Sequence, residues 1–309
     1  LTIIDRILKK IKKSIDIDID IYRLPLDDEP TYRLLRDVRT LGIFQLESRG
    51  MMNLIRQMQI RNFTDISTCI ALFRPGPMEN IPSFLRRRSG KEKITYLHPD
   101  LKPILEDTTG IIVFQEQIMQ IAHLYAGYTL GEADVLRRAV SKKIEKVLLE
   151  ERKRFVEKCR ERHHPDATSN QIYDYIVKFA NYGFNKSHSV AYSMVAYWMA
   201  YLKANYPAQF MTALMDNAIG SQTATELYLR ECQTLGIEIL PPDINKSGKT
   251  YQTEKDDLRY PFLGIRYIGP SVADQLELIR SDRPFSSFVD FVFRAKDVNV
   301  RVIESLILV

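Results

Sequence analysis

The sequence predicts a mainly α protein, in which a multi-helical domain is followed by a small α+β segment with a helix-hairpin-helix motif. Apolar residues recur at helical spacing along much of the chain, and Ser/Thr-x-x-Glu capping boxes mark helix starts. The composition changes near residue 240, where "GIEILPPDINKSGKTYQ" is rich in proline and turn residues. We therefore predict a domain boundary there, with residues 1–240 and 241–309 as the two parts.

Individual helices and turns can be placed from local signals. "LTIIDRILKKIKK" is an amphipathic helix already under way, and "RVIESLILV" stops inside a helical pattern, so both ends suggest a piece of a longer chain. Capping boxes at Thr129–Glu132 and Thr223–Glu226 predict two further helix starts, and Gly236 predicts a helix end. "RPGP", residues 74–77, predicts a rigid turn between helices, whereas "YPFLGIRYIG" reads as strand and turn.

Composition narrows the class of protein. The chain is 45% hydrophobic and 27% charged with a net charge of +5, which is typical of a globular protein and favours an anionic partner. Cys69, Cys159 and Cys232 are scattered, which predicts reduced, buried thiols in a cytoplasmic protein and no zinc site. The apolar run 190–202 is too short to cross a bilayer, and we expect a helix buried on all sides.

The most informative stretch is the polar tetrad Asn185, Lys186, Ser187 and His188, which directly precedes this apolar run. Gly183 predicts the end of one helix, so the tetrad lies at the N-terminus of the next. Unsatisfied N–H groups and the helix dipole favour an anion there. Lys186 adds a charge and Tyr182 a nearby ring, a set that suits a polyphosphate beside a sugar or base. The alternative is a simple helix cap with the other side chains in water.

Other basic groups favour the phosphate interpretation. Arg137 and Arg138 follow the first capping box, with Lys142 and Lys143 beyond them. Arg86, Arg87 and Arg88 follow the proline turn that contains Arg74. Each patch alone is typical of a solvated helix face, but several patches with interleaved aromatic residues indicate a surface that follows phosphates.

Two further patterns resemble functional motifs. Asp16, Asp18 and Asp20 alternate with isoleucine like a metal site, but no phosphate-binding motif adjoins them, and we expect a solvated edge strand without catalysis. Ile268-Gly269, followed by Ser271, Ala273 and a helix, outlines the hairpin that gives a helix-hairpin-helix motif its name. Such a hairpin offers backbone N–H groups to a DNA phosphate whatever the base sequence. The alternative is a Gly-Pro turn before a packing helix.

Several longer motifs together resemble one family. The chain is similar, along essentially its whole length, to the alpha subunit of bacterial DNA polymerase III, a C-family replicative polymerase. The motifs occur in family order: "GIFQLESRGM" (42–51), "ALFRPGP" (71–77), "GIIVFQEQIMQIA" (110–122), "AGYTLGEADVLRRA" (126–139), "YGFNKSHSVAY" (182–192) and "ILPPDIN" (239–245).

The resemblance implies that residues 1–240 form the polymerase fingers and that residues 241–309 begin the clamp-binding region. It implies binding of the incoming deoxynucleoside triphosphate by Arg137, Arg138, Tyr182, Asn185, Lys186, Ser187 and His188. It also implies contacts to primer-template DNA from Arg74, Arg86, Arg87, Arg88, Ile268, Gly269 and Ser271. The catalytic Mg²⁺ ions would be held by aspartates of a palm domain before this segment, so we expect the 309 residues alone to be inactive.

The sliding clamp and other replisome subunits would be met mostly through regions outside this chain, and no membrane is implied. Two other classes of protein stay open from the residues alone. One is a stand-alone helical nucleic-acid-binding module, which would bind DNA without preferring nucleotides. The other is a helical interaction scaffold whose basic patches are ordinary surface.

Overall fold

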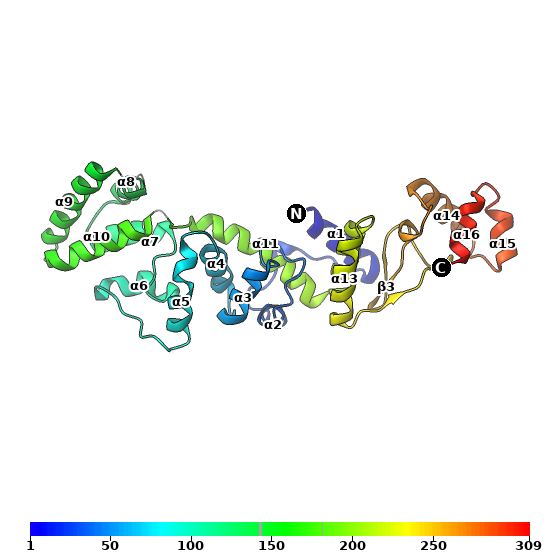
Figure 1. The fold of residues 1–309 in the computed structure, drawn as a ribbon, viewed down its shortest axis with the longest axis horizontal. Helices are drawn as coiled ribbons and strands as arrows, with labels where there is room; N and C mark the ends of the chain where they lie inside the picture. Colours follow the sequence, from blue (N-terminus) through cyan, green and yellow to red (C-terminus); the bar gives the residue numbers. More distant parts are fainter. Residues whose placement is uncertain (142–143, 181) are drawn as a thin grey trace. The chain divides into compact units, whose positions relative to one another are not determined.

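The computed structural model describes residues 1–141, 144–180 and 182–309 (Figure 1). The described residues are mainly helical, with one small sheet in the C-terminal part of the chain, as the sequence predicts. The residues pack as two compact units, one formed by 1–25 with 198–309 and the other by 26–197. The predicted boundary at residue 240 lies within the first of these units, and the assignment of 1–240 and 241–309 to separate functions stays a prediction.

The first unit is built on an amphipathic helix packed against a helix from the middle of the chain. Helix α1 (Thr2–Ile15) buries Ile4, Ile7 and Ile11 and packs on α12 (Pro207–Ala218), which also contacts α13 (Gln222–Leu235). A three-stranded sheet follows in the order β1-β3-β2, parallel between β1 and β3 and antiparallel between β2 and β3. Its strands are β1 (Ile239–Leu240), β2 (Gln252–Glu254) and β3 (Asp257–Arg259).

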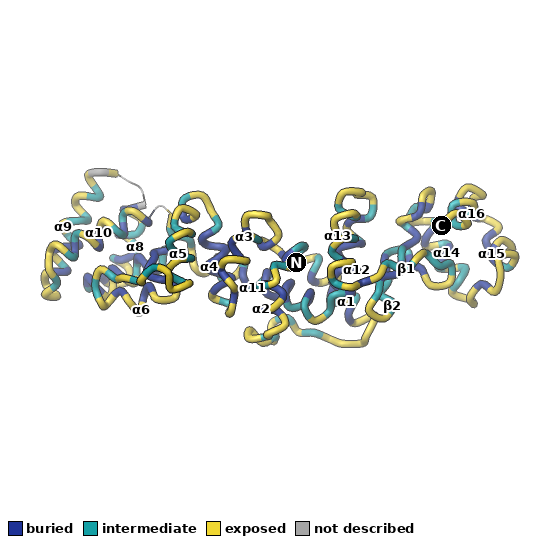
Figure 2. Tube along the Cα trace, turned by 60° about the horizontal axis from the view of Figure 1, so that its bottom comes forward, coloured by how far each residue is buried: buried dark blue, intermediate teal, exposed yellow. Residues whose placement is uncertain are grey.

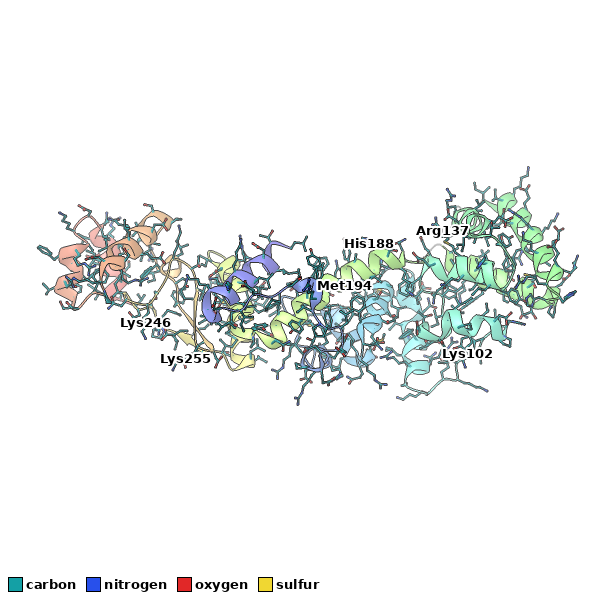
Figure 3. The ribbon with its side chains drawn as sticks, turned by 180° about the vertical axis from the view of Figure 1, so that it is seen from behind. Lys102, Arg137, His188, Met194, Lys246 and Lys255 are labelled. Atoms are coloured by element: carbon teal, nitrogen blue, oxygen red, sulfur yellow. The ribbon has the colours of Figure 1, made fainter. Side chains whose placement is uncertain are left out.

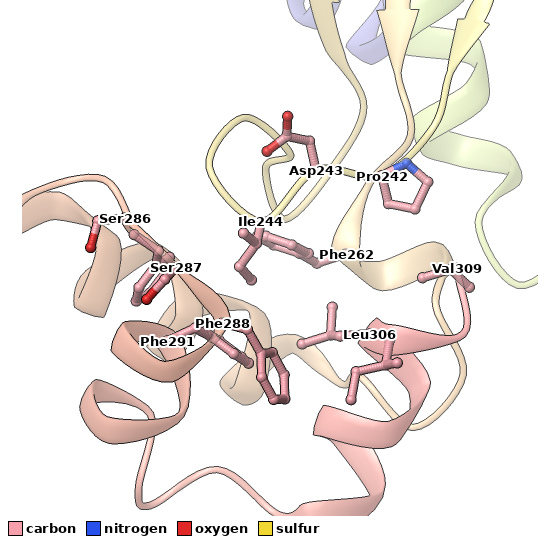
Figure 4. Close-up of a pocket in the computed structure, with 12 residues that line it drawn as sticks. Pro242, Asp243, Ile244, Phe262, Ser286, Ser287, Phe288, Phe291, Leu306 and Val309 are labelled. Carbon is pink, nitrogen blue, oxygen red and sulfur yellow. The ribbon is translucent and has the colours of Figure 1, made fainter.

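The same unit ends in a small helical cluster with its own apolar core. It contains the 3₁₀ helix η5 (Phe262–Gly264) and the helices α14 (Pro270–Asp282), α15 (Phe288–Arg294) and α16 (Val300–Ile307). Phe262, Ile265, Ile268, Phe285 and Phe291 are buried in that core. A pocket of about 370 Å³ opens beside it, lined by residues from η5, α15 and α16 (Figure 4).

In its described residues, the second unit is helical apart from turns, loops and one isolated β-bridge. Figure 2 shows that buried and exposed positions alternate along most of its helices, as expected for amphipathic segments. Its helices are α2 (Glu29–Arg36), α3 (Arg49–Met58), α4 (Phe63–Leu72), α5 (Ile81–Arg88), α6 (Lys102–Leu105), α7 (Gln115–Leu124), α8 (Leu130–Ser141), α9 (Glu145–Glu161), α10 (Asp166–Ala180) and the start of α11 (Lys186–Asn205). Short 3₁₀ helices η2 (Pro77–Asn80), η3 (Pro99–Leu101) and η4 (Glu106–Thr108) connect them.

Several local predictions are confirmed. The Thr129 hydroxyl accepts from the backbone N–H of Glu132, whose carboxylate accepts from the backbone N–H of Thr129, a reciprocal capping box. Gly236 ends α13 in the left-handed conformation. All three cysteines are free and buried. In the part of the chain that the structure describes, no helix is long and apolar enough to span a membrane.

The prediction of a second capping box, at Thr223–Glu226, is wrong. Helix α13 begins at Gln222, and its cap is Ser221, whose hydroxyl accepts from the backbone N–H of Ala224 at 3.4 Å. Thr223 is therefore already inside the helix, because a competent cap stands two residues before it.

Two predicted strands are also absent from these segments. Asp16 and Asp18 both pair with the Lys12 ammonium at 2.7 Å, and Asp20 caps the 3₁₀ helix η1 (Ile21–Arg23), so the acidic run folds back on α1 instead of forming an edge strand. The segment "YPFLGIRYIG" forms η5 and a tight turn. Its spacing of Ile265 and Ile268 buries both on one side of the turn, which a two-residue alternation cannot do.

The apolar helix α11 is buried all round only over residues 196–200, whereas Ala191 is exposed. Lys203, near the end of the same helix, is fully buried and pairs with Glu231 at 2.5 Å. A buried lysine ammonium is tolerated because this carboxylate pairs with it.

Candidate nucleotide and DNA contact sites

A single β-bridge joins the starts of helices α7 and α11. The backbone N–H of Gln115 donates to the Phe184 carbonyl, and the N–H of Phe184 donates to the Val113 carbonyl, both at 2.9 Å. Gly183 makes this approach possible, because a Cβ there would lie 3.2 Å from Gln115 Cγ and 3.3 Å from its backbone nitrogen. The N-termini of two helices consequently lie side by side.

The start of α11 already holds an anion. Asn185 caps the helix by accepting from the backbone N–H of His188 at 2.8 Å, as one reading of the tetrad predicts. The Glu116 carboxylate accepts from the backbone N–H of Lys186 at 2.9 Å and from the Asn185 side-chain amide at 3.2 Å. A carboxylate is stabilised there by the free N–H groups and the helix dipole, so the position has the electrostatic character expected of an anion site.

The charged and aromatic side chains of the tetrad face solvent. Lys186, Ser187 and His188 are exposed, and the Lys186 ammonium lies 5.7 Å from the centre of the Phe114 ring. No carboxylate of a described residue lies within 4.0 Å of that ammonium. The His188 imidazole stacks at a tilt on Tyr192, with ring centres 4.2 Å apart. A cation held over a ring, without a carboxylate partner, is available to a ligand.

Arg137 reaches the same place from helix α8. Its guanidinium donates to Gln115 Oε1 at 3.2 Å and to Asp134 Oδ1 at 3.0 and 2.8 Å. Arg138 also pairs with Asp134, at 2.8 Å, but its side chain is 61% exposed. Hydrogen bonding to Arg137 is the main cause that lowers the pKa of Asp134, so this carboxylate stays charged between the two arginines. Figure 3 labels Arg137 on α8 and His188 in the first turn of α11.

We call the group Arg137, Gln115, Glu116, Asn185 and Lys186 the α7/α11 cluster. Its members come from the starts of α7 and α11 and from α8. Arg137 donates to Gln115, and both Asn185 and Lys186 donate to Glu116. Gln115 and Glu116 are neighbours in sequence, so these bonds join all five residues. Lys142 and Lys143, which the sequence places near Arg138, lie outside the described residues.

Arg74 and Tyr182 lie next to this cluster. The Arg74 guanidinium is 4.2 Å from the centre of the Phe184 ring. The Tyr182 ring packs on Gly76, where a Cβ would lie 2.0 Å from Tyr182 Cδ1 and where φ is +96°. The close contact with Tyr182 and the positive φ both require glycine at position 76. The turn places Arg74 over Phe184, just before the start of α11.

An aromatic pocket of about 550 Å³ adjoins Arg74 and His188. Phe44 and Tyr192 form one wall, with ring centres 5.2 Å apart. The pocket is lined by Phe44, Gln45, Glu47, Ser48, Met51, Ile70, Phe73, Arg74, Phe184, His188 and Tyr192. Sequence reasoning assigned no role to Phe44, Gln45 or Tyr192.

The run Arg86–Arg88 has internal partners. Arg88 donates to both carboxylate oxygens of the buried Asp65 at 2.7 Å and to the Met58 carbonyl at 2.9 Å. Arg86 and Arg87 share the Glu92 carboxylate at 3.0 and 2.6 Å. Hydrogen bonds from Arg87 and Ser83 lower the pKa of Glu92 to about 2, with a smaller effect from Arg86. Of the three arginines, only Arg86 has a side chain that is more than half exposed.

The hairpin in the first unit turns before α14. Gly269 is the N-cap, with an ordinary φ of −88°, and it is Tyr267 that has a left-handed φ of +66°. Ile268 is 5% exposed and anchors the turn in the core. Arg266, Tyr267 and Ser271 are exposed, and the Arg266 guanidinium lies 4.9 Å from the Tyr267 ring centre. A DNA duplex could therefore contact Arg266, Tyr267 and Ser271, whereas the buried Ile268 holds the turn in place.

Sequence comparison identifies the family of the chain. Residues 1–163 match the bacterial DNA polymerase III alpha subunit finger domain, and residues 236–309 match a helix-hairpin-helix motif. The chain is 47% identical to DNA polymerase III subunit alpha of Bacillus subtilis (strain 168), 43% to that of Staphylococcus aureus (strain MRSA252) and 42% to that of Thermus aquaticus, with at least 99% of the chain aligned in each case. The chain therefore belongs to the bacterial DNA polymerase III alpha subunits. It spans 26–29% of the length of these curated relatives.

Proposed function

We propose that this chain is the fingers segment of a DNA-directed DNA polymerase and that the α7/α11 cluster binds the triphosphate of the incoming deoxynucleotide. The observation that carries the proposal is that Arg137 bonds to Gln115 at the start of α7 and Lys186 stands at the start of α11, two helix N-termini that the Phe114–Phe184 bridge joins. Positive groups brought together from separate helices can neutralise a polyphosphate, which one surface lysine cannot do.

The Glu116 carboxylate limits where a phosphate can bind at the start of α11. Glu116 accepts the hydrogen bonds that a phosphate oxygen would accept at the start of α11. A triphosphate therefore displaces this carboxylate or binds beside it, between Lys186 and Arg137. Ser187 and Asn185 supply short donors at the same end, and Arg138 adds charge from the exposed side of α8.

Neighbouring aromatic groups suit the rest of the nucleotide. Tyr182 is 43% exposed and packs on the "RPGP" turn, and His188 lines the aromatic pocket. Rings in this position can stack on a sugar or base. We therefore assign Tyr182 and His188 to the nucleoside part and the cluster to its phosphates.

DNA contacts are assigned to two places. In the first unit, the exposed residues Arg266, Tyr267 and Ser271 with the backbone at Gly269 bind a phosphate of the duplex, and Ile268 anchors the turn. In the second unit, Arg74 and Arg86 are the exposed members of the set that the sequence assigns to DNA, and we assign them to the DNA backbone. Arg87 and Arg88 each already have an acidic partner, so a DNA contact from either arginine would have to replace that ion pair.

The residues described here do not fit the Mg²⁺ ions that the reaction needs. The acidic run that resembles a metal site is engaged elsewhere, since Asp16 and Asp18 pair with Lys12 and Asp20 caps η1. We propose that the metals bind elsewhere in the parent polymerase, that the fingers position the nucleotide in the cytoplasm of the cell, and that the purified chain does not extend a primer. Metal-dependent incorporation by the 309 residues alone would overturn this part of the proposal.

A binding titration tests the nucleotide site directly. We expect the purified chain to bind deoxynucleoside triphosphate saturably, more tightly with primed DNA present, and to lose most of that binding in Lys186→Ala. Lys178→Ala is the matched control, because Lys178 is also exposed and its ammonium lies 5.4 Å from the Phe179 ring centre, but it stands in the last turn of α10. Equal losses in both variants, or DNA binding with no nucleotide preference, would favour a general nucleic-acid-binding module instead.

A further inference from the structure

Two histidines and an aspartate from separate segments meet at the far end of α7. His98 and Asp100 lie at the start of η3, and His164 lies in the turn between α9 and α10. One ligand atom from each of the three residues lies within 4.8 Å of the other two. The Asp100 carboxylate is 3.4 Å from His98 Nδ1 and 4.0 Å from His164 Nε2. None of these residues belongs to the α7/α11 cluster.

Both imidazoles are held in place by their surroundings. The His164 ring stacks on Tyr125 with ring centres 4.0 Å apart. His98 contacts the edge of Tyr125 at 5.1 Å and the His164 ring at 4.9 Å. His98 Nδ1 also accepts from the backbone N–H of Asp100 at 3.3 Å. These contacts fix the orientation of both rings before any ligand binds.

The donor atoms of the group suit a cation as ligand. Two imidazole nitrogens and one carboxylate oxygen lie within 4.8 Å of one another, and each can donate a lone pair to a metal ion. Asp100 is half-exposed and supplies one negative charge. The arrangement recurs in the sequence, since each of the two histidines begins a His-Pro-Asp triplet, at 98–100 and at 164–166.

We propose that His98, Asp100 and His164 form a binding site for a divalent transition-metal ion of the Zn²⁺ class, with water completing the coordination. Zinc bonds of about 2.0–2.1 Å in tetrahedral geometry separate neighbouring ligand atoms by about 3.3 Å. The His98–Asp100 separation of 3.4 Å matches this spacing, whereas the 4.0 Å between Asp100 and His164 is longer, and every separation in the group is at most 4.8 Å. Metal binding therefore requires side-chain rotations that shorten these distances and release His98 Nδ1 from the Asp100 N–H.

Such an ion would connect two segments that are distant in sequence. The loop before α6 and the α9–α10 turn would share one metal, next to the C-terminal end of α7. A ligand that binds only the folded state stabilises it, so bound metal should raise the unfolding temperature. The donor set of two imidazoles and one carboxylate favours Zn²⁺ or Co²⁺ over Mg²⁺, which prefers oxygen ligands.

Cobalt titration gives a readout that is independent of polymerase activity. The metal-depleted 309-residue chain should bind one equivalent of Co²⁺ with visible d–d absorption, and Zn²⁺ should displace it. Asp100→Asn and His164→Ala should each weaken binding by about ten-fold or more. His163→Asn is the matched control, because His163 is the exposed neighbour of His164 and asparagine tolerates its left-handed φ of +62°.

The outcomes separate a built site from histidines that only pack together. One equivalent of metal, lost in Asp100→Asn and His164→Ala and kept in His163→Asn, supports the site. Absence of saturable Co²⁺ binding in the unaltered chain overturns it, as does binding that survives in both ligand variants. Asp100→Asn keeps the test valid even if His164→Ala disturbs the stacking on Tyr125, because the Asp100 side chain is 48% exposed.

Discussion

The run Arg86–Arg88 and the pair Arg137 and Lys186 are both basic groups in the second unit, yet they have different surroundings. Arg88 donates two hydrogen bonds to a carboxylate that is 7% exposed. Lys186 lies over an aromatic ring at the start of a helix, where the charge of a lysine opposes the helix dipole. Arg88 therefore stabilises the fold, whereas Lys186 slightly lowers the stability of the helix that it begins.

This difference shows that the density of basic residues is a poor guide to ligand contacts. Three consecutive arginines look like the stronger phosphate signal in the sequence, but two of them have side chains no more than about one-fifth exposed, with acidic partners. Arg137 lies between these cases, because it pairs with Asp134 and also reaches Gln115 beside the anion position. The partner of a basic side chain, more than its charge, indicates its role.

The largest effect is expected for Arg88→Ala. Removing Arg88 leaves the Asp65 carboxylate buried without its bidentate partner, and breaking a buried pair in this way costs about 3 kcal/mol. Arg86→Ala is the matched control on the same helix. Its side chain is 54% exposed, and loss of its pairing with Glu92 should change stability by less than about 1 kcal/mol. Denaturant unfolding of the two variants measures the difference.

The comparison would fail if Arg88→Ala folded with unchanged stability and lost DNA binding. That result would return Arg88 to the DNA contacts that the sequence predicts. A double variant with Asp65 also replaced by alanine should recover part of the lost stability, since no buried charge is then left unpaired.

Lys186→Ala should behave in the opposite way. In a full-length polymerase, it should lower the efficiency of nucleotide incorporation by roughly ten- to a hundred-fold, the value of a charge-assisted phosphate contact of about 1.5–3 kcal/mol. Stability and binding of primed DNA should stay close to wild type. Arg137→Ala should have a similar effect, and the double variant should be non-additive if both residues hold one triphosphate.

Single-turnover incorporation against nucleotide concentration decides between the roles of Lys186. A weaker apparent affinity for nucleotide, with DNA binding intact, supports the assignment. Normal nucleotide dependence with impaired DNA binding would move the α7/α11 cluster to the DNA path, and loss of folding would make it structural.

Glu116→Gln should produce a smaller change in the other direction. The Glu116 carboxylate occupies the N–H groups at the start of α11, and neutralising it removes an anion that competes with a phosphate. An effect of about 1 kcal/mol, or roughly five-fold tighter nucleotide binding, is expected for a charge at a helix N-terminus. Weaker nucleotide binding in this variant would instead mean that Glu116 positions Lys186 and Asn185 for the ligand.

Sequence patterns predicted helices correctly where the interactions that form the helix lie within the pattern itself. The reciprocal cap at Thr129 and the buried stripe of α1 follow from local chemistry, and both are confirmed. The Thr223 box was wrong because Ser221, a better-placed cap, precedes it. The acidic run failed as a strand because Lys12, one helix turn away, captures two of its carboxylates.

The charged residues of the candidate site could be predicted from the sequence, but the residues that link them by hydrogen bonds could not. The tetrad and Arg137 were found from residue type and position. Gln115 and Glu116, which link them, stand in a motif with no charge excess, and only the Phe114–Phe184 bridge brings them to α11. The "QEQ" in "GIIVFQEQIMQIA" was the available signal, because polar residues directly after a buried run often mark a helix start.

The smallest effect is expected at the hairpin, where Gly269→Val tests the DNA contact of the first unit. Gly269 has an ordinary φ of −88°, and among the described residues no atom lies within 4 Å of a Cβ built there, so valine fits without strain. Any loss of duplex binding therefore comes from blocking the approach of a phosphate to the backbone. Gly131→Ala, at the other glycine of ordinary φ with open space around it, is the matched control.

The expected signature is a change in salt dependence that is the same for every DNA sequence. Losing one phosphate contact should reduce the slope of log affinity against log salt by about one. The change should be uniform, because a backbone N–H at a turn reads phosphate and not bases. Nucleotide binding at the α7/α11 cluster should be unaffected, which keeps this test independent of Lys186. An unchanged slope in a folded Gly269→Val chain would leave Gly269-Pro270 as a turn before a packing helix, with Arg266 and Tyr267 as ordinary surface residues.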